Sequence, residues 1–211
     1  MIQFSRREAI KFGWEITKRN IYFFIIVLLL INGVSFSLFF LRVFLENKNV
    51  LFAFPLSLLS TIVEAIFALG LIKIALKFYK NEEPEISDIF SEYRLVLKYL
   101  LASFIYVLIS GLGFFLLVIP GIIFSIRFWF FGYLIVDKNL GVIESLKKSW
   151  EITKGNTFNL FVFFVLLALI NILGFLALVV GLFLSIPTSL MAQAFVYRKL
   201  SESLELKNQE N

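Results

Sequence analysis

Residues 155–197 read GNTFNLFVFFVLLALINILGFLALVVGLFLSIPTSLMAQAFVY, a run without a single acidic or basic side chain. As one straight helix this run would be about 65 Å long, whereas the hydrocarbon core of a bilayer is only about 30 Å thick. We therefore expect the run to fold back inside a membrane as a helical hairpin. The candidates for the turn are Gly181 and Pro187.

The rest of the chain contains two further stretches of this kind. Residues 99–136 are interrupted only by Arg127, and residues 21–41 and 50–72 are separated by a short polar segment around 46–49. Each stretch is long enough for two helices that cross a bilayer. The sequence therefore predicts an all-α polytopic membrane protein whose six transmembrane helices form three hairpins.

The overall composition agrees with this class. Of the 211 residues, 60% are hydrophobic and 17% are charged, and the mean hydropathy is +0.90. Soluble domains have about 45–50% apolar and about 25% charged residues. Six spans would use about 120 residues, which leaves short loops and surface helices but no separate soluble domain. We therefore expect a single membrane domain over residues 1–211.

The basic residues indicate how the chain is oriented. All but three of the 20 lysines and arginines lie near the two ends or in the links between the hairpins, and the exceptions are Arg42, Lys48 and Arg127. Cytoplasmic loops carry such an excess of cations. We expect a multi-pass protein of the plasma (inner) membrane with both termini in the cytoplasm. No nucleic-acid partner is expected, because no domain remains to carry a folded basic surface.

Two segments that precede long apolar runs are similar in sequence. Residues 8–20 read EAIKFGWEITKRN and residues 144–156 read ESLKKSWEITKGN, which are identical at eight of thirteen positions. Such a match indicates an internal repeat. A weaker middle copy is suggested by Pro55, Pro120 and Pro187, which are spaced by 65 and 67 residues.

Two interpretations of the repeat stay open. In the one we favour, three copies of a unit (1–80, 81–138 and 139–211) each contain an amphipathic helix, a span, a tip and a second span marked by proline. In the other, a single ancestral duplication is accompanied by prolines whose spacing has no structural meaning.

An amphipathic interfacial helix is expected before each hairpin. Aromatic residues beside cations on a helix are typical of the headgroup layer of a membrane. The predicted interfacial anchors are Trp14, Tyr93, Trp150, Lys147 and Lys148. These helices either only anchor the ends of the spans, which is the interpretation we favour, or bind anionic lipid or a partner.

A few polar side chains lie inside the apolar runs. Glu64 and Arg127 are the charges set most clearly at membrane depth, where a charge costs at least about 2.5–3.5 kcal/mol. Gln193, Asn32 and Asn171 lie at comparable positions. We expect these five residues to form an intramembrane polar centre with an ion pair between Glu64 and Arg127. The centre either fixes helix packing, as we favour, or binds a substrate, a lipid headgroup or a proton.

The chain contains no histidine and no cysteine. This excludes disulfides, imidazole or thiolate metal ligands and Cys–His nucleophiles. We therefore expect no catalytic residue, no metal site and no cofactor, and we do not expect an enzyme.

One part of the chain also resembles a known pattern. The pattern consists of Ile119-Pro120-Gly121, Asp137, Glu144-Ser145-Leu146 and Ser149-Trp150-x-x-Thr153-x-Gly155. It is similar to YciC-like integral membrane proteins and to the membrane domain fused to some glycerophosphodiester phosphodiesterases. The resemblance implies a six-span helical protein and, through the fused hydrolase, work connected with lipids. It implies no catalysis, because the soluble hydrolase domain has no counterpart here.

The sequence is compatible with two functions. The first is a non-enzymatic membrane protein that binds membrane lipids, a membrane-protein partner or a second copy of itself. The alternative is a small transporter or channel whose path is lined by the intramembrane polar centre. Internal repeats are common in transporters, although here the hairpins repeat in the same orientation.

Overall fold

The computed structural model describes residues 4–46, 53–177 and 180–209. Within these ranges the chain is helical and contains no strand. In chain order the elements are α1 (Arg6–Arg19), α2 (Ile21–Glu46), α3 (Ala53–Tyr79), α4 (Asp88–Ser91), the 3-10 turn η2 (Tyr93–Leu95), α5 (Val96–Leu116), α6 (Val118–Phe128), α7 (Phe131–Lys138), α8 (Val142–Ile152), α9 (Thr157–Leu176) and α10 (Leu182–Gln209).

Five segments of the described chain are long and apolar enough to cross a membrane. They are Ile21–Leu45, Phe54–Tyr79, Asp88–Leu116, Val118–Lys138 and Thr157–Leu176. The expectation of an all-α membrane protein with several spans is therefore confirmed. The helix expected as a sixth span, α10, is not among the five, because its apolar part ends at Tyr197 and charged side chains follow from Arg198 onward.

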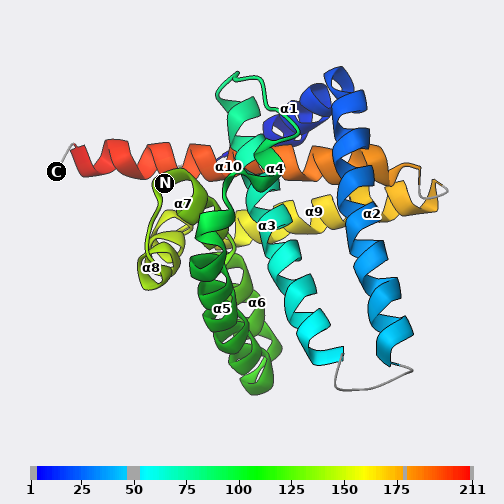
Figure 1. Cartoon of the computed structure of the whole chain (residues 1–211). Coiled ribbons are helices and arrows are strands. Elements are labelled where there is room, and N and C mark those ends of the chain that lie inside the picture. The colour runs from blue at the N-terminus through cyan, green and yellow to red at the C-terminus, as the bar shows by residue number, and fades with distance from the viewer. Residues whose placement is uncertain (1–3, 47–52, 178–179, 210–211) are drawn as a thin grey trace.

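Consecutive long helices lie against each other. α2 contacts α3, α5 contacts α6, and α9 contacts α10. In Figure 1, α2, α3, α5 and α6 run down the view, whereas α9 and α10 run across it. The polar segment expected to link α2 to α3 falls largely on residues 47–52, which lie outside the described residues.

Glycines mark the contact between α5 and α6. A Cβ atom on Gly113 would lie 2.9 Å from the Cα of Gly121. The two helices can therefore approach closely only because neither residue has a side chain at this point. A single extended residue, Leu117, separates them.

The shorter helices pack onto long helices of a different pair. α1 precedes α2 in the chain but lies along α10, and α4 precedes α5 but lies against α3. α8 precedes α9 but lies against α5, α6 and α7. Each short helix thus packs on the pair of long helices that precedes it in the chain. The pattern is cyclic, because the first short helix, α1, packs on the last long helix, α10 (Figure 1).

The buried core contains side chains from α2, α3, α7, α9 and α10. Among its largest fully buried side chains are Leu69 and Ile74 of α3, Leu134 of α7, and Met191 and Tyr197 of α10. Most of the large exposed hydrophobic side chains lie instead on the spanning helices. An apolar surface of this extent is what a chain in contact with lipid requires.

Candidate functional site

One face of α1 is held directly on α10. Ala9, Gly13 and Thr17 are buried on this face. A Cβ on Gly13 would lie 2.3 Å from the carbonyl oxygen of Thr188, so the two helices meet backbone to backbone. Trp14 lies off this contact and is 46% exposed. The small residues, and not the large ones, therefore decide which side of α1 faces the protein.

The same stripe of small residues recurs on α8. Ser145, Ser149 and Thr153 stand at the positions that correspond to Ala9, Gly13 and Thr17 in the repeated segment, and all three are fully buried. This stripe was not predicted, although its spacing of four residues is visible in both copies of the repeated segment.

The stripe on α8 meets a break in the fourth candidate span. α6 ends at Phe128 and α7 begins at Phe131. The hydroxyl of Ser149 accepts a hydrogen bond from the Phe130 amide at 3.1 Å and donates one to the Arg127 carbonyl at 2.9 Å. Backbone groups freed at a helix break inside a membrane must find partners. Ser149 supplies them from outside the span.

Arg127 is held by α8. Its Nη2 donates to the Trp150 carbonyl at 2.8 Å, and its guanidinium carbon lies 3.8 Å from the centroid of the Trp150 ring. The carbonyl belongs to the last turn of α8, where the helix dipole favours a cation. An aromatic face stabilises a guanidinium in the same way.

The expected ion pair between Glu64 and Arg127 is not formed. Within the part of the chain that the structure describes, neither residue has an ion-pair partner. Glu64 is exposed on α3 and lines a small cavity of about 90 Å³ together with Ser35, Arg42 and Ser60. Arg127 is instead held by the Trp150 carbonyl and ring, although its Nε is buried without a hydrogen-bond partner.

The three polar amides of the expected centre have separate partners. Gln193 accepts a hydrogen bond from the Trp129 indole at 2.9 Å. Asn171 donates to the Ser189 hydroxyl at 2.9 Å, and so links α9 to α10. Asn32 donates to a carbonyl of its own helix. The contacts of Gln193 and Asn171 join different helices, that of Asn32 does not, and none of them gathers the side chains around one centre.

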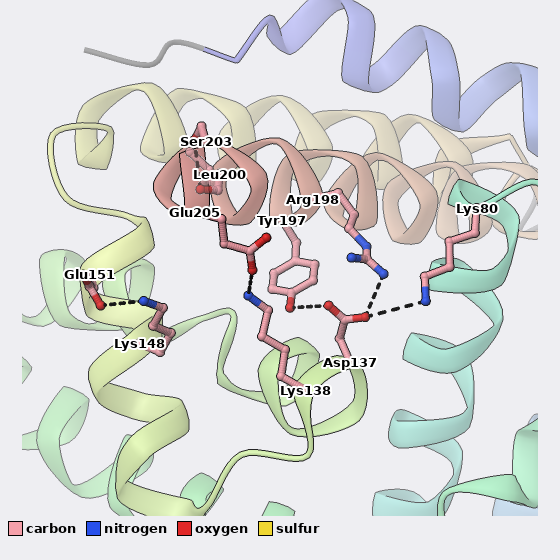
Figure 2. Close-up of polar contacts among 10 residues, drawn as sticks. All are labelled: Lys80, Asp137, Lys138, Lys148, Glu151, Tyr197, Arg198, Leu200, Ser203 and Glu205. Atoms are coloured by element: carbon pink, nitrogen blue, oxygen red, sulfur yellow. Dashed lines mark hydrogen bonds and ion pairs between the residues drawn. The ribbon is translucent and has the colours of Figure 1, made fainter. Parts of the chain in front are cut away.

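The five predicted interfacial anchors differ in exposure. Trp14, Tyr93 and Lys147 are exposed, whereas Trp150 is half-buried beneath Arg127. Lys148 is half-buried and forms an ion pair with Glu151 at 3.0 Å (Figure 2). Trp150 therefore belongs to the contact between α8 and α6, whereas Trp14, at the corresponding position of α1, is exposed.

A buried carboxylate joins three of the long segments. Asp137 accepts a hydrogen bond from the Tyr197 hydroxyl at 2.9 Å and another from Arg198 at 2.7 Å. Lys80 lies 4.0 Å away (Figure 2). From the sequence, Asp137 was only part of a family resemblance, and no role was predicted for it.

Two further ion pairs fasten α4 and the turn that follows it to α3. Lys77 lies 2.7 Å from Asp88, and Lys73 lies 2.8 Å from Glu92. Asp88 and Glu92 are therefore engaged with lysines of α3. Among the described residues there is no group of three or more acidic side chains that could hold a metal ion.

A groove of about 1020 Å³ lies between the start of α1 and α9. We call it the basic groove, and its lining residues are Phe4, Ser5, Arg6, Arg7, Ile10, Lys11, Trp14, Phe158, Asn159 and Leu166. The cations all come from α1, whereas α9 contributes two apolar side chains and one amide. The groove thus places positive charge beside an apolar wall.

Comparison with known proteins gives one match. Residues 90–204 match the profile of a family described as a domain of unknown function (DUF7847). No curated protein and no solved structure matches the chain. The matched region includes Asp137 with Tyr197 and Arg198, and the contact between Arg127 and Trp150, and it excludes α1. Because the match covers more than half of the sequence, the chain belongs to the DUF7847 family.

Proposed function

We propose that the chain crosses the plasma (inner) membrane six times as three hairpins, with both termini in the cytoplasm. Five candidate spans support this arrangement. The apolar part of α10, residues 182–197, is about 24 Å long, and a segment somewhat shorter than the bilayer is accommodated by local thinning or by flanking cations. Arg198 and Lys199 stand at its end.

Cysteine labelling tests this topology without background, because the native chain has no cysteine. A cysteine introduced by Ala177→Cys, between α9 and α10, should react with a membrane-impermeant maleimide added from outside the inner membrane. A control cysteine introduced by Ser203→Cys, near the end of α10, should react only after the membrane is opened. Labelling of both positions from the same side would contradict the six-span arrangement.

We also propose that the chain consists of three repeats and that their amphipathic helices share one role. The cyclic packing of α1, α4 and α8 supports this, since each helix lies against the pair that precedes its own. The matching small faces of α1 and α8 support it further. Each of these helices would connect two neighbouring hairpins at the cytoplasmic surface.

The function that we propose is non-enzymatic binding of membrane lipid at this surface. The observation that carries the proposal is the fixed orientation of α1. Because Gly13 holds the helix against α10, Trp14 and the cations of α1 are turned away from α10 and form a preformed surface beside α9. Cations and tryptophan on such a helix are suited to lipid headgroups.

Lipid retention tests this function. The full chain is purified in a mild detergent, washed with excess detergent, and analysed by native mass spectrometry. We expect phospholipid molecules to stay bound at a defined stoichiometry. A thermal unfolding transition shows whether the purified protein is folded. If it is folded but retains no lipid of any class, the proposal is contradicted.

A small transporter or channel is the second candidate, and one observation favours it. Glu64, Arg42, Ser35 and Ser60 line a common cavity between two spans. Its volume of about 90 Å³ corresponds to roughly three water molecules. If this cavity is part of a path, Glu64→Gln should change proton or cation flux into liposomes measured with an ion-sensitive dye. Equal flux in liposomes with native protein, with the variant and with no protein would exclude this candidate.

A further inference from the structure

We propose that the basic groove binds one anionic phospholipid, with its phosphate beside Arg6, Arg7 and Lys11 and an acyl chain along α9. This inference rests on the proposed lipid-binding function and gives it a location and a headgroup charge. It is argued from the charges at the start of α1, from the apolar wall and from the shape of the groove.

The start of α1 holds an excess of positive charge. Arg6 and Arg7 are its first two residues, and neither has an ion-pair partner among the described residues. The N-terminus of a helix is itself the positive end of the helix dipole and disfavours cations. An anion placed here would reduce the repulsion between the two arginines and also the repulsion between the arginines and the helix dipole.

The nearby acidic residues do not remove this excess. Glu8 is exposed in the first turn of α1, and its backbone N–H is capped by Ser5 at 3.3 Å. Glu15 lies 3.8 Å from Lys11, and both side chains are mostly exposed. Such an exposed pair is weak. Neither Glu8 nor Glu15 lines the groove, whereas all three cations do.

The other wall of the groove is suited to an acyl chain. Phe158 and Leu166 line it from two positions on α9 that are about 12 Å apart along the helix axis. Phe158 stands near the start of α9, and Leu166 lies further along the span. The groove therefore leads from the level of the cations toward the apolar middle of a candidate transmembrane helix.

Phe4, which precedes α1, is fastened to this wall. The Asn159 amide donates to the Phe4 carbonyl at 3.2 Å, and the Phe4 ring packs edge-on against Phe163 with centroids 5.7 Å apart. Phe4 is buried. These contacts hold the first residues of α1 in place, so the cations stand at a fixed position beside α9.

Size and composition favour a lipid over a soluble phosphate. The volume of about 1020 Å³ is at the upper end of small-molecule sites, which are about 300–1,000 Å³. An inorganic phosphate would leave the apolar wall uncovered. A zwitterionic phosphatidylcholine would bring its own cation beside the three of α1, so an anionic headgroup such as phosphatidylglycerol is preferred.

The first experiment compares two variants of equal charge. The groove variant carries Arg6→Gln, Arg7→Gln and Lys11→Gln. The control variant carries Lys18→Gln, Arg19→Gln and Lys147→Gln, which removes three exposed cations from the same interfacial helices but outside the groove. Each full-length protein is incubated with equimolar phosphatidylglycerol and phosphatidylcholine in detergent, and bound lipid is counted by native mass spectrometry.

We expect wild type to bind one phosphatidylglycerol selectively. Each cation near an anionic group contributes roughly a fivefold gain in affinity. In the groove variant, the ratio of bound phosphatidylglycerol to bound phosphatidylcholine should therefore fall by more than about tenfold. The control variant should keep it. Equal losses in both variants, or no loss in the groove variant, would overturn the proposal.

The failure of this inference is distinct from the failure of the proposed function. If wild type binds both lipids equally, lipid binding stands but the anionic site does not. If wild type binds neither lipid, the proposed function itself is wrong. Inorganic phosphate at millimolar concentration should not displace the lipid. Complete displacement would mean that the groove recognises soluble phosphate.

A second measurement uses the native groove and does not depend on folding of the triple variant. Trp14 lines the groove and is exposed, so lipids with brominated acyl chains should quench its fluorescence. We expect stronger quenching by brominated phosphatidylglycerol than by brominated phosphatidylcholine. This difference should disappear in the Trp14→Phe variant, in which Trp129 and Trp150 remain. A difference that persists without Trp14 would place the lipid elsewhere.

Discussion

The Tyr197 hydroxyl donates a hydrogen bond of 2.9 Å to the buried carboxylate of Asp137 and so joins α10 to α7. Arg198, the next residue on α10, donates to the other carboxylate oxygen at 2.7 Å. Burial of a carboxylate is costly unless hydrogen bonds and an opposite charge compensate it. Asp137 therefore has the partners that it needs only when α10 lies against α7.

This relationship predicts a large effect for Tyr197→Phe and a small one for Lys80→Gln. A hydrogen bond to a charged group contributes about 1.5–3 kcal/mol, and we expect Tyr197→Phe to reduce the free energy of unfolding by that amount. Lys80 is 4.0 Å from Asp137 and half exposed, and such pairs contribute about 0–1 kcal/mol. Thermal unfolding in detergent measures both. Equal losses of unfolding free energy in the two variants would show that the Tyr197 hydroxyl stabilises Asp137 no more than Lys80 does.

The helix break at Trp129 and Phe130 predicts a specific role for Ser149. Ser149→Ala leaves the Phe130 amide without its partner and removes a donor from the Arg127 carbonyl, so we expect a loss of about 1–3 kcal/mol. Ser145→Ala is the matched control, because the equally buried Ser145 bonds only to the Val142 carbonyl of its own helix. Hydrogen exchange at the break should rise in Ser149→Ala only. Similar exchange in both variants would contradict the capping role.

The close approach of α1 to α10 makes Gly13 sensitive to a single methyl group. In Gly13→Ala the new Cβ would meet the Thr188 carbonyl at 2.3 Å, and overpacking of this kind costs about 1–3 kcal/mol. In Gly33→Ala the new Cβ meets nothing within 4 Å, and alanine is favoured over glycine in a helix by about 1 kcal/mol. Proteolysis near α1, together with thermal unfolding, should separate the two variants. A stable Gly13→Ala would show that α1 can pack differently.

The contacts of Arg127 predict which residue it is coupled to. A double-mutant cycle with Arg127→Gln and Trp150→Leu should give a coupling energy of about 0.5–2 kcal/mol, because the guanidinium stacks on the ring. The cycle of Arg127→Gln with Glu64→Gln should give a value near zero. A strong coupling to Glu64 would restore the ion pair that the sequence analysis expected. Thermal unfolding in the same detergent provides all the required values.

Much of the fold could be predicted from the sequence. The run 155–197 and its two counterparts predicted an all-helical membrane protein, and the helices of the structure begin and end near the expected places. One exception is the fourth span, which breaks into α6 and α7. Another is α10, in which the apolar residues are too few for a full candidate span. The charges that follow Tyr197 continue the same helix and do not end it, which the charge pattern alone could not show.

Less of the candidate site could be predicted. Trp14 and Trp150 occupy the same position in the repeated segment, yet one is exposed and the other lies beneath Arg127. Their different surroundings come from segments far away in the chain. The basic groove likewise depends on α9 lying beside the start of α1, although about 150 residues separate them.

Local sequence is enough to assign this chain to the helical membrane proteins, because a helix satisfies its own backbone hydrogen bonds and its transfer into hydrocarbon depends on local composition. Tertiary structure alone decided the partners of Arg127, the burial of Asp137 and the orientation of α1. These depend on which helices approach closely enough, and that is set by small side chains such as Gly13 at contacts between distant segments. Helix contacts in a membrane are selected by such packing and by hydrogen bonds, not by hydrophobicity, so the apolar pattern carries little information about them.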